Sequence, residues 1–159
     1  MKRFVWMAIM ILLFLLIVMQ LIPIKRLTSE ISPAKDFLTI CNAPADIKIL
    51  IKNACYDCHS YETVLPWYAK VAPVSWMIKH HIAEGIDKLN FSDWTSYSPD
   101  DIKGLIKSCN VDIKDGDMPL LSYKLMHKEA HLNDKEINNI LNFFNKMENI
   151  SSQGKDSDE

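Results

Sequence analysis

Residues 55 to 59 read Cys55-Tyr56-Asp57-Cys58-His59, and the interpretation of the whole chain starts from this stretch. The pattern C-x-x-C-H is the attachment signature of a c-type haem, because two thiols at this spacing can each add to one vinyl group of the same porphyrin. The imidazole that follows can coordinate the iron from the proximal side. The stretch therefore predicts one covalently attached haem c, held by Cys55 and Cys58, with His59 as an iron ligand.

Other kinds of site also use C-x-x-C, namely redox dithiols and zinc knuckles. A zinc site needs a second pair of ligands at similar spacing, but the sequence has no second C-x-x-C, and Cys41 and Cys109 stand alone. A thioredoxin-type dithiol lies on a βαβ unit, and no strand-like alternation flanks Cys55. A periplasmic thiol-disulfide oxidoreductase that uses Cys55 and Cys58 remains the alternative from another protein class.

Charge is distributed unevenly along the 159 residues, although the formal net charge is only −2. The only two arginines, Arg3 and Arg26, lie near the N-terminus, and all twenty acidic residues lie from Glu30 onward. Residues 27–159 carry fourteen lysines against these twenty acids, a net charge of −6. A mildly acidic segment without arginine argues against a nucleic-acid partner. The length fits one domain plus an anchor.

The N-terminal run from Phe4 to Ile22 is apolar except for Gln20. Nineteen such residues are long enough to cross a hydrocarbon core as a helix. Neither a small-x-small cleavage site nor a lipid-anchoring cysteine follows the run, so residues 1–26 are expected to be an uncleaved signal anchor. Flanking charges do not orient it, but covalent haem attachment takes place outside the bacterial cytoplasmic membrane. A single-pass inner-membrane protein with its haem domain in the periplasm is therefore expected.

Apolar periodicity predicts that the rest of the chain is all-α, in four or five helices. Residues 27–43 are rich in Ser, Thr, Asn and Pro and are expected to form a tether. The haem domain is expected over 44–149 and a disordered polar tail over 150–159. The predicted helices cover about 44–55, 73–89, 98–113 and 133–147.

Capping signals mark the start of the last two of these helices. Ser98 with Pro99 and Asp101 fits an N-cap, an N1 proline and an N3 acid, and Asn133 with Glu136 resembles a capping box. In a cytochrome c-like fold the final helix crosses the first soluble helix and closes the haem pocket.

Several short motifs outside the central stretch follow one another in a specific order. They are Pro66-Trp67-Tyr68, Ala72-Pro73-Val74-Ser75-Trp76, Glu84-Gly85, Leu89-Asn90-Phe91-Ser92, Trp94, Gly116-Asp117-Met118-Pro119-Leu120, Ser122-Tyr123 and His127. Together with C-x-x-C-H, this order and spacing resemble the bacterial haem-binding domain family over roughly residues 40 to 148. The resemblance implies a small mono-haem c-type domain with redox function, often behind an N-terminal membrane anchor. Leu121 departs from the family, whose members commonly carry a second proline there.

The loop that ends in Met118-Pro119 is the second candidate site. A thioether held by a following proline can reach the iron from the distal side, because proline fixes the backbone and donates no competing hydrogen bond. His/Met ligation raises the haem potential. Met118 is therefore the predicted sixth ligand. The alternatives are His81, Met126, His127, His131 or an open site.

The predicted function is one-electron transfer by a membrane-anchored carrier, with redox proteins as partners of unknown identity and no catalytic constellation of its own. A haem-based sensor or small-ligand binder is the second possibility, and it requires an open or labile sixth site. Cys41 and Cys109 can form a disulfide outside the cytoplasm or serve as two small buried hydrophobic residues. The sequence leaves both options open.

Overall fold

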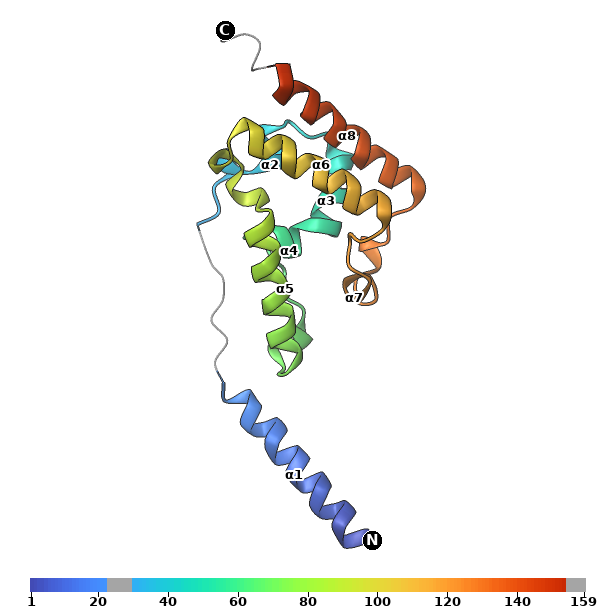
Figure 1. Ribbon diagram of the computed structural model, residues 1–159. Helices are drawn as coiled ribbons and strands as arrows, with labels where there is room; N and C mark the ends of the chain where they lie inside the picture. Colours follow the sequence, from blue (N-terminus) through green and yellow to red (C-terminus); the bar gives the residue numbers. More distant parts are fainter. Residues whose placement is uncertain (23–29, 154–159) are drawn as a thin grey trace.

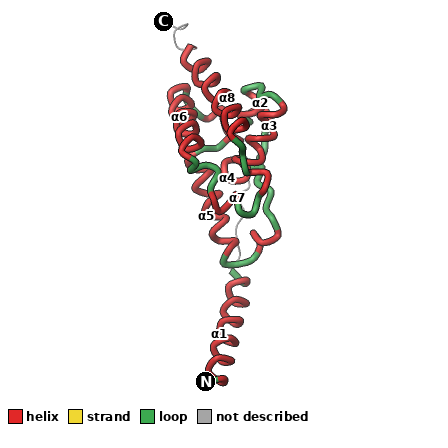
Figure 2. Tube along the Cα trace, turned by 90° about the vertical axis from the view of Figure 1, so that its right-hand side faces the viewer, coloured by secondary structure: helices red, strands yellow, loops and turns green. Residues whose placement is uncertain are grey.

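The computed structural model of the protein describes residues 1–22 and 30–153, with side chains up to residue 149. Every regular element in these ranges is a helix and no strand occurs among them (Figure 2). The prediction of an all-α chain with an N-terminal apolar helix is confirmed.

Helix α1 (Lys2–Gln20) contains no buried residue and has a mean hydropathy of 2.3. It extends from one end of the molecule, and the other helices lie beyond its C-terminal end (Figure 1). Among the described residues it is the one helix long and apolar enough to cross a membrane, a test that a signal sequence also passes. The Gln20 side chain meets the backbone of Ala72 twice: its Nε2 donates to the Ala72 oxygen at 3.1 Å, and the Ala72 N–H donates to its Oε1 at 2.9 Å.

Seven further α-helices form the rest of the molecule, joined by short turns. They are α2 (Phe37–Ile40), α3 (Ala45–Ile51), α4 (Asp57–His59), α5 (Val74–Lys88), α6 (Pro99–Asp115), α7 (Leu121–Lys124) and α8 (Asp134–Gln153). A π-helical turn (Lys52–Tyr56) joins α3 to α4, and 3₁₀ turns lie at Pro33–Lys35, Trp67–Lys70, Phe91–Ser96 and Lys128–Ala130. Helix α8 thus includes the first residues of the expected tail, and residues 154–159 lie outside the described part.

Helices α6 and α8 pack side by side, and α3 packs against α8 (Figure 1). Both predicted capping boxes are present. The Ser98 hydroxyl accepts from Asp101 N–H at 3.2 Å, and the Asp101 carboxylate accepts from Ser98 N–H at 3.3 Å. Asn133 and Glu136 make the equivalent pair at 3.0 and 2.8 Å. Each cap satisfies backbone N–H groups that have no partner inside the helix.

The core is built around Phe37, which is completely buried. Its ring centroid lies 4.5 Å from Trp94, 5.0 Å from Phe91 and 5.9 Å from Phe144. Aromatic rings at these separations add to the free energy gained by burying their surface. The core therefore joins α2 to the segment after α5 and to α8.

The prediction that residues 27–43 form a tether is therefore wrong for the second half of that range. Residues 36 to 38 are buried, and the domain begins before residue 44. Asp36 caps α2 by accepting from Thr39 N–H at 3.0 Å, so a polar, proline-containing stretch hides a short buried helix. The first half of the expected tether, 23–29, lies outside the described residues.

Candidate functional site

The C-x-x-C-H stretch follows α3 without a break in the helical path, through the π-helical turn and into α4. A π turn is rare and is frequently found at functional sites. Cys55, Cys58 and His59 are all partly buried here. The structure therefore presents the motif from a helical segment inside the domain.

Two cavities flank the motif. One, of about 370 Å³, is lined by Cys55, His59 and Met118, together with Cys109 and Asp112 of α6. The other, of about 310 Å³, has a mainly apolar lining that includes Cys58, Met77, His81, Tyr123, Met126 and His127. The two cysteines of the motif therefore face different cavities, and the motif lies between them.

The imidazole of His59 is fixed by two backbone carbonyls. Its Nδ1 lies 2.9 Å from the Gly85 oxygen and 3.2 Å from the Leu89 oxygen. A carbonyl oxygen can only accept, so Nδ1 carries the proton, and in the neutral ring Nε2 keeps its lone pair. Burial lowers the pKa of His59 below its ordinary value of 6.5, although the carbonyl hydrogen bonds act in the opposite direction. The ring is therefore neutral at pH 7 and ready to bind a metal through Nε2.

Asp57, between the two cysteines, receives one hydrogen bond from the loop that follows α4 and one from α7. Its carboxylate accepts from Val64 N–H at 2.8 Å and from the Tyr123 hydroxyl at 2.8 Å. Burial and then the Asp57 carboxylate raise the pKa of Tyr123, so this phenol remains a donor at neutral pH. The bond ties α7 and the Met118 loop that precedes it to the motif.

Tyr56, the residue before Asp57, is anchored by the residue that caps α2. Its hydroxyl donates to the Asp36 carboxylate at 2.6 Å in a buried position. Burial, followed by the hydrogen bond to Asp36, raises the pKa of Tyr56. The two variable positions of C-x-x-C-H are thus both engaged by partners from other elements.

Met118 lies in the loop after α6, where its N–H donates to the Asp112 oxygen at 3.0 Å. The side chain is partly buried against the core and lines the same cavity as His59. The other ligand candidates lie elsewhere. His81, Met126 and His127 line the second cavity, and the exposed His131 has its Nε2 2.8 Å from the Lys124 oxygen.

Comparison with known families places this geometry in context. A family model described as haem-binding domain matches residues 14–146, most of the chain. The chain belongs to the haem-binding domain family. Searches of curated proteins and of solved structures each found no match.

The residues of this haem-binding domain suit a haem. The structure offers a neutral imidazole nitrogen, a thioether on the same cavity, two thiols and two cavities with mainly apolar linings. A zinc knuckle is not supported by the described residues, because no three His, Cys, Asp or Glu side chains gather among them as a metal site requires.

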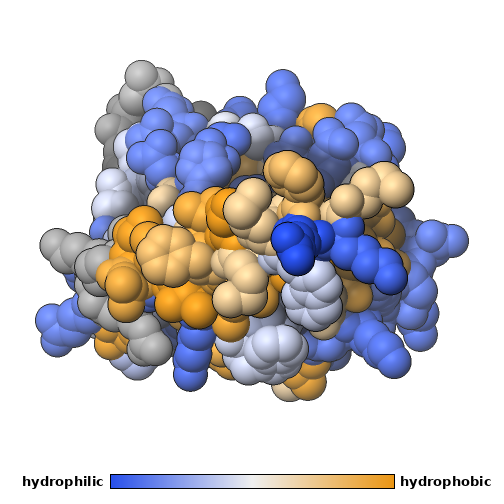
Figure 3. Space-filling view, turned by 90° about the horizontal axis from the view of Figure 1, so that it is seen from below, coloured by the Kyte–Doolittle hydropathy of each residue, from blue (hydrophilic) through white to orange (hydrophobic). Residues whose placement is uncertain are grey.

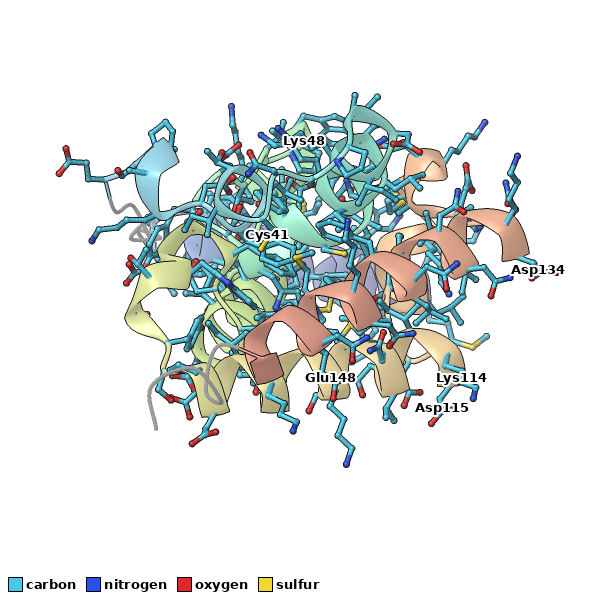
Figure 4. All side chains as sticks on the ribbon, turned by 90° about the horizontal axis from the view of Figure 1, so that it is seen from above. Cys41, Lys48, Lys114, Asp115, Asp134 and Glu148 are labelled. Carbon is cyan, nitrogen blue, oxygen red and sulfur yellow. The ribbon has the colours of Figure 1, made fainter. Side chains whose placement is uncertain are left out.

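All four cysteines are free thiols in the structure. Cys41 and Cys109 both pack against the hydrophobic core and are not joined by a disulfide. In the structure they therefore serve as two small hydrophobic residues. In Figure 4, seen from above, the partly buried Cys41 lies within the outline of the domain, whereas Lys114, Asp115 and Asp134 lie at its edge.

Gly85, Tyr123 and Cys109 received no site role from the sequence. The role of Gly85 could have been suspected from its position on the apolar face of a predicted helix, since a glycine there often marks close packing. Tyr123 lies in one of the motifs of the family resemblance. No sequence signal places Cys109 beside Cys55, because their proximity depends on how α6 packs against the motif.

Proposed function

We propose that this haem-binding domain is a membrane-anchored, mono-haem c-type cytochrome that transfers single electrons. Cys55 and Cys58 hold the haem by thioether bonds, His59 is its proximal ligand and Met118 its distal ligand. The observation that carries the proposal is the His59 ring, whose Nδ1 is fixed by the carbonyls of Gly85 and Leu89 on a cavity that Met118 also lines.

Attachment requires the two thiols to add across the two vinyl groups of the porphyrin. Each addition would bond sulfur to one vinyl carbon and place the hydrogen on the other, so no oxidant would be consumed. Burial, with Cys109 and Cys58 nearby, raises the pKa of Cys55 to about 12, and burial with Asp57 raises the pKa of Cys58 to about 11. Thiol-disulfide enzymes need the opposite shift, a lowered thiol pKa, so these values argue against the dithiol alternative.

The bound haem supplies an iron that cycles between the ferric and ferrous states. The chain contributes the rest. The Gly85 and Leu89 carbonyls orient the His59 ring, and mainly apolar side chains line the cavities on which the motif lies. As an iron ligand, the Met118 thioether would favour the ferrous state and so raise the potential. This cytochrome c-like chemistry needs no acid or base, in keeping with a carrier and not a catalyst.

Helix α1 supports the membrane part of the proposal by its length and apolar surface. Since covalent haem attachment occurs outside the cytoplasmic membrane, we place α1 in the bacterial inner membrane and the haem domain in the periplasm. Redox proteins of that compartment are the proposed partners, and nucleic acid is not among them.

The test is the absorption spectrum of the full chain, produced in a bacterium with haem-attachment machinery. Haem that stays with the polypeptide after acid-acetone extraction supports thioether bonds. A near-infrared band from methionine sulfur to ferric iron, lost in Met118→Ala and kept in Met126→Ala, supports distal ligation by Met118. The second variant is the matched control, because Met126 lines only the other cavity.

Two outcomes contradict parts of the proposal separately. Covalent haem without the near-infrared band, together with ready carbon monoxide binding by the ferrous protein, favours the sensor alternative with an open or labile sixth site. Complete absence of attached haem contradicts the c-type assignment.

A further inference from the structure

One end of the haem domain carries exposed apolar side chains on a single stretch of chain. We call Val64, Trp67, Val71, Val74 and Met77 the apolar rim. Trp67 is 77% exposed and Val64 74% exposed, and the other three are between 39% and 50% exposed. Large apolar side chains gathered on one surface usually mark an interaction site.

The apolar rim lies where α1 meets the domain. The last residue of α1, Gln20, bonds both backbone groups of Ala72, which lies between Val71 and Val74. Figures 1 and 2 both show the lower end of α5 and the loop before it beside the C-terminal end of α1. Figure 3 views the molecule from this end, with the apolar surface of α1 in the foreground.

A helix that spans a bilayer ends at the level of the lipid headgroups. The residues after Gln20 are still apolar and exposed, Leu21 at 76% and Ile22 at 53%. Because Gln20 holds Ala72 directly, the neighbouring rim residues lie close to the depth at which α1 leaves the membrane. Tryptophan is enriched at that depth, since its ring is apolar and its N–H can reach water or headgroups.

The same loop also carries a positive charge that suits a phospholipid surface. Lys70, between Trp67 and Val71, is exposed and forms the last residue of the short 3₁₀ turn. A lysine can extend its ammonium toward phosphate groups while its stem stays on apolar surface. The combination of tryptophan, valines and one lysine is what a headgroup–acyl boundary accommodates.

We propose that the apolar rim docks onto the headgroup–acyl boundary of the same bilayer that α1 spans. This inference rests on the membrane anchoring proposed above. Docking holds the haem domain against the lipid surface in one orientation. Val64, Val74 and Met77 also line the second cavity, so docking places that cavity beside the bilayer.

The experiment uses the full chain, carrying its haem, in vesicles of phosphatidylcholine and phosphatidylglycerol that contain a phospholipid with a photoactivatable diazirine. After illumination, mass spectrometry maps the lipid-labelled peptides. Label is expected on α1 and on the peptide with Trp67 and Val71. No label above background is expected on α6 at Val111, an exposed apolar residue (48%) outside the rim.

Variants separate docking from chance contact. Trp67→Asp combined with Val71→Asp is expected to lower the label on this loop by at least about fivefold, because apolar contacts are replaced by charge at the lipid surface. Label on α1 and the haem absorption spectrum should not change. Val111→Asp is the matched control and should leave the loop label as it is.

The possible failures are distinguishable. Label on α1 with none on the loop overturns docking and leaves the anchor intact, as does loop label that the double variant does not reduce. Absence of label on α1 itself overturns the membrane anchoring, and docking with it.

Discussion

Gly85 of α5 lies directly against the backbone of Cys58. A Cβ atom added at Gly85 would overlap the Cys58 carbonyl oxygen and would lie 3.0 Å from its carbonyl carbon and 3.3 Å from its Cβ. The same glycine supplies the carbonyl that accepts from His59 Nδ1. Close approach of α5 and orientation of the His59 imidazole therefore depend on one residue without a side chain.

Gly85→Ala is expected to lower the free energy of unfolding by about 1–3 kcal/mol, because backbone atoms cannot move aside as a side chain could. Movement of α5 away from Cys58 also displaces the carbonyl that holds His59, so a smaller fraction of chains should carry covalent haem. Denaturant unfolding and the ratio of haem to polypeptide measure the two effects.

Gly104 provides the matched control, since it lies in α6 with nothing within 4 Å of an added Cβ. Gly104→Ala is expected to stabilise the protein by about 0.4–1 kcal/mol, because alanine lowers the entropy of the unfolded chain. Equal effects of the two substitutions would contradict the packing argument for Gly85.

Tyr123→Phe removes the hydroxyl that donates to the Asp57 carboxylate. A loss of about 1–2 kcal/mol in unfolding free energy is expected, because Asp57 keeps its bond from Val64 N–H but loses its other donor. Denaturant titration measures this loss. Tyr61→Phe is the control, since no hydrogen bond of the Tyr61 hydroxyl is found in the described part of the chain, and it should be close to neutral.

Tyr56→Phe breaks the buried bond to Asp36 and is expected to cost about 2–3 kcal/mol of unfolding free energy, because it leaves a buried carboxylate with fewer donors. A double-mutant cycle with Asp36→Asn checks the cause. The combined variant should lose less than the two single variants added together. Strict additivity of the two losses would show that this bond does not couple α2 to the motif.

The thiol count of the haem-loaded protein follows from the cysteine arrangement. After denaturation without reductant, two thiols per chain are expected, from Cys41 and Cys109, because the proposed haem attachment consumes the thiols of Cys55 and Cys58. Titration with a thiol reagent measures the count. No reactive thiol would indicate a Cys41–Cys109 disulfide instead, and four would contradict covalent attachment.

Local chemistry explains which parts of the fold could be predicted from the sequence. The starts of α6 and α8 were predictable because a capping box places its signal within four consecutive residues. The buried helix α2 was missed because four residues are too few to show a 3.6-residue period. Burial of Phe37 depends on Phe91 and Phe144, which come much later in the chain.

For the candidate site, the identities of Cys55, Cys58 and His59 came from spacing alone, and their roles toward haem remain predictions, as does ligation by Met118. Membership of the haem-binding domain family supports the haem but does not test these individual roles. The geometry around the residues was not predictable, because Gly85, Tyr123 and Cys109 reach the motif from other elements.

The sequence by itself determined the all-α class, the apolar N-terminal helix and a haem-attachment pattern. Periodicity, composition and C-x-x-C-H are all properties of residues that lie close together in the chain. Only the tertiary structure decided which nitrogen of His59 is held by backbone carbonyls. The two carbonyls that hold its Nδ1 lie 26 and 30 residues further along the chain. A hydrogen bond across that separation exists only once α5 has packed against the motif, and that packing requires the absence of a side chain at Gly85.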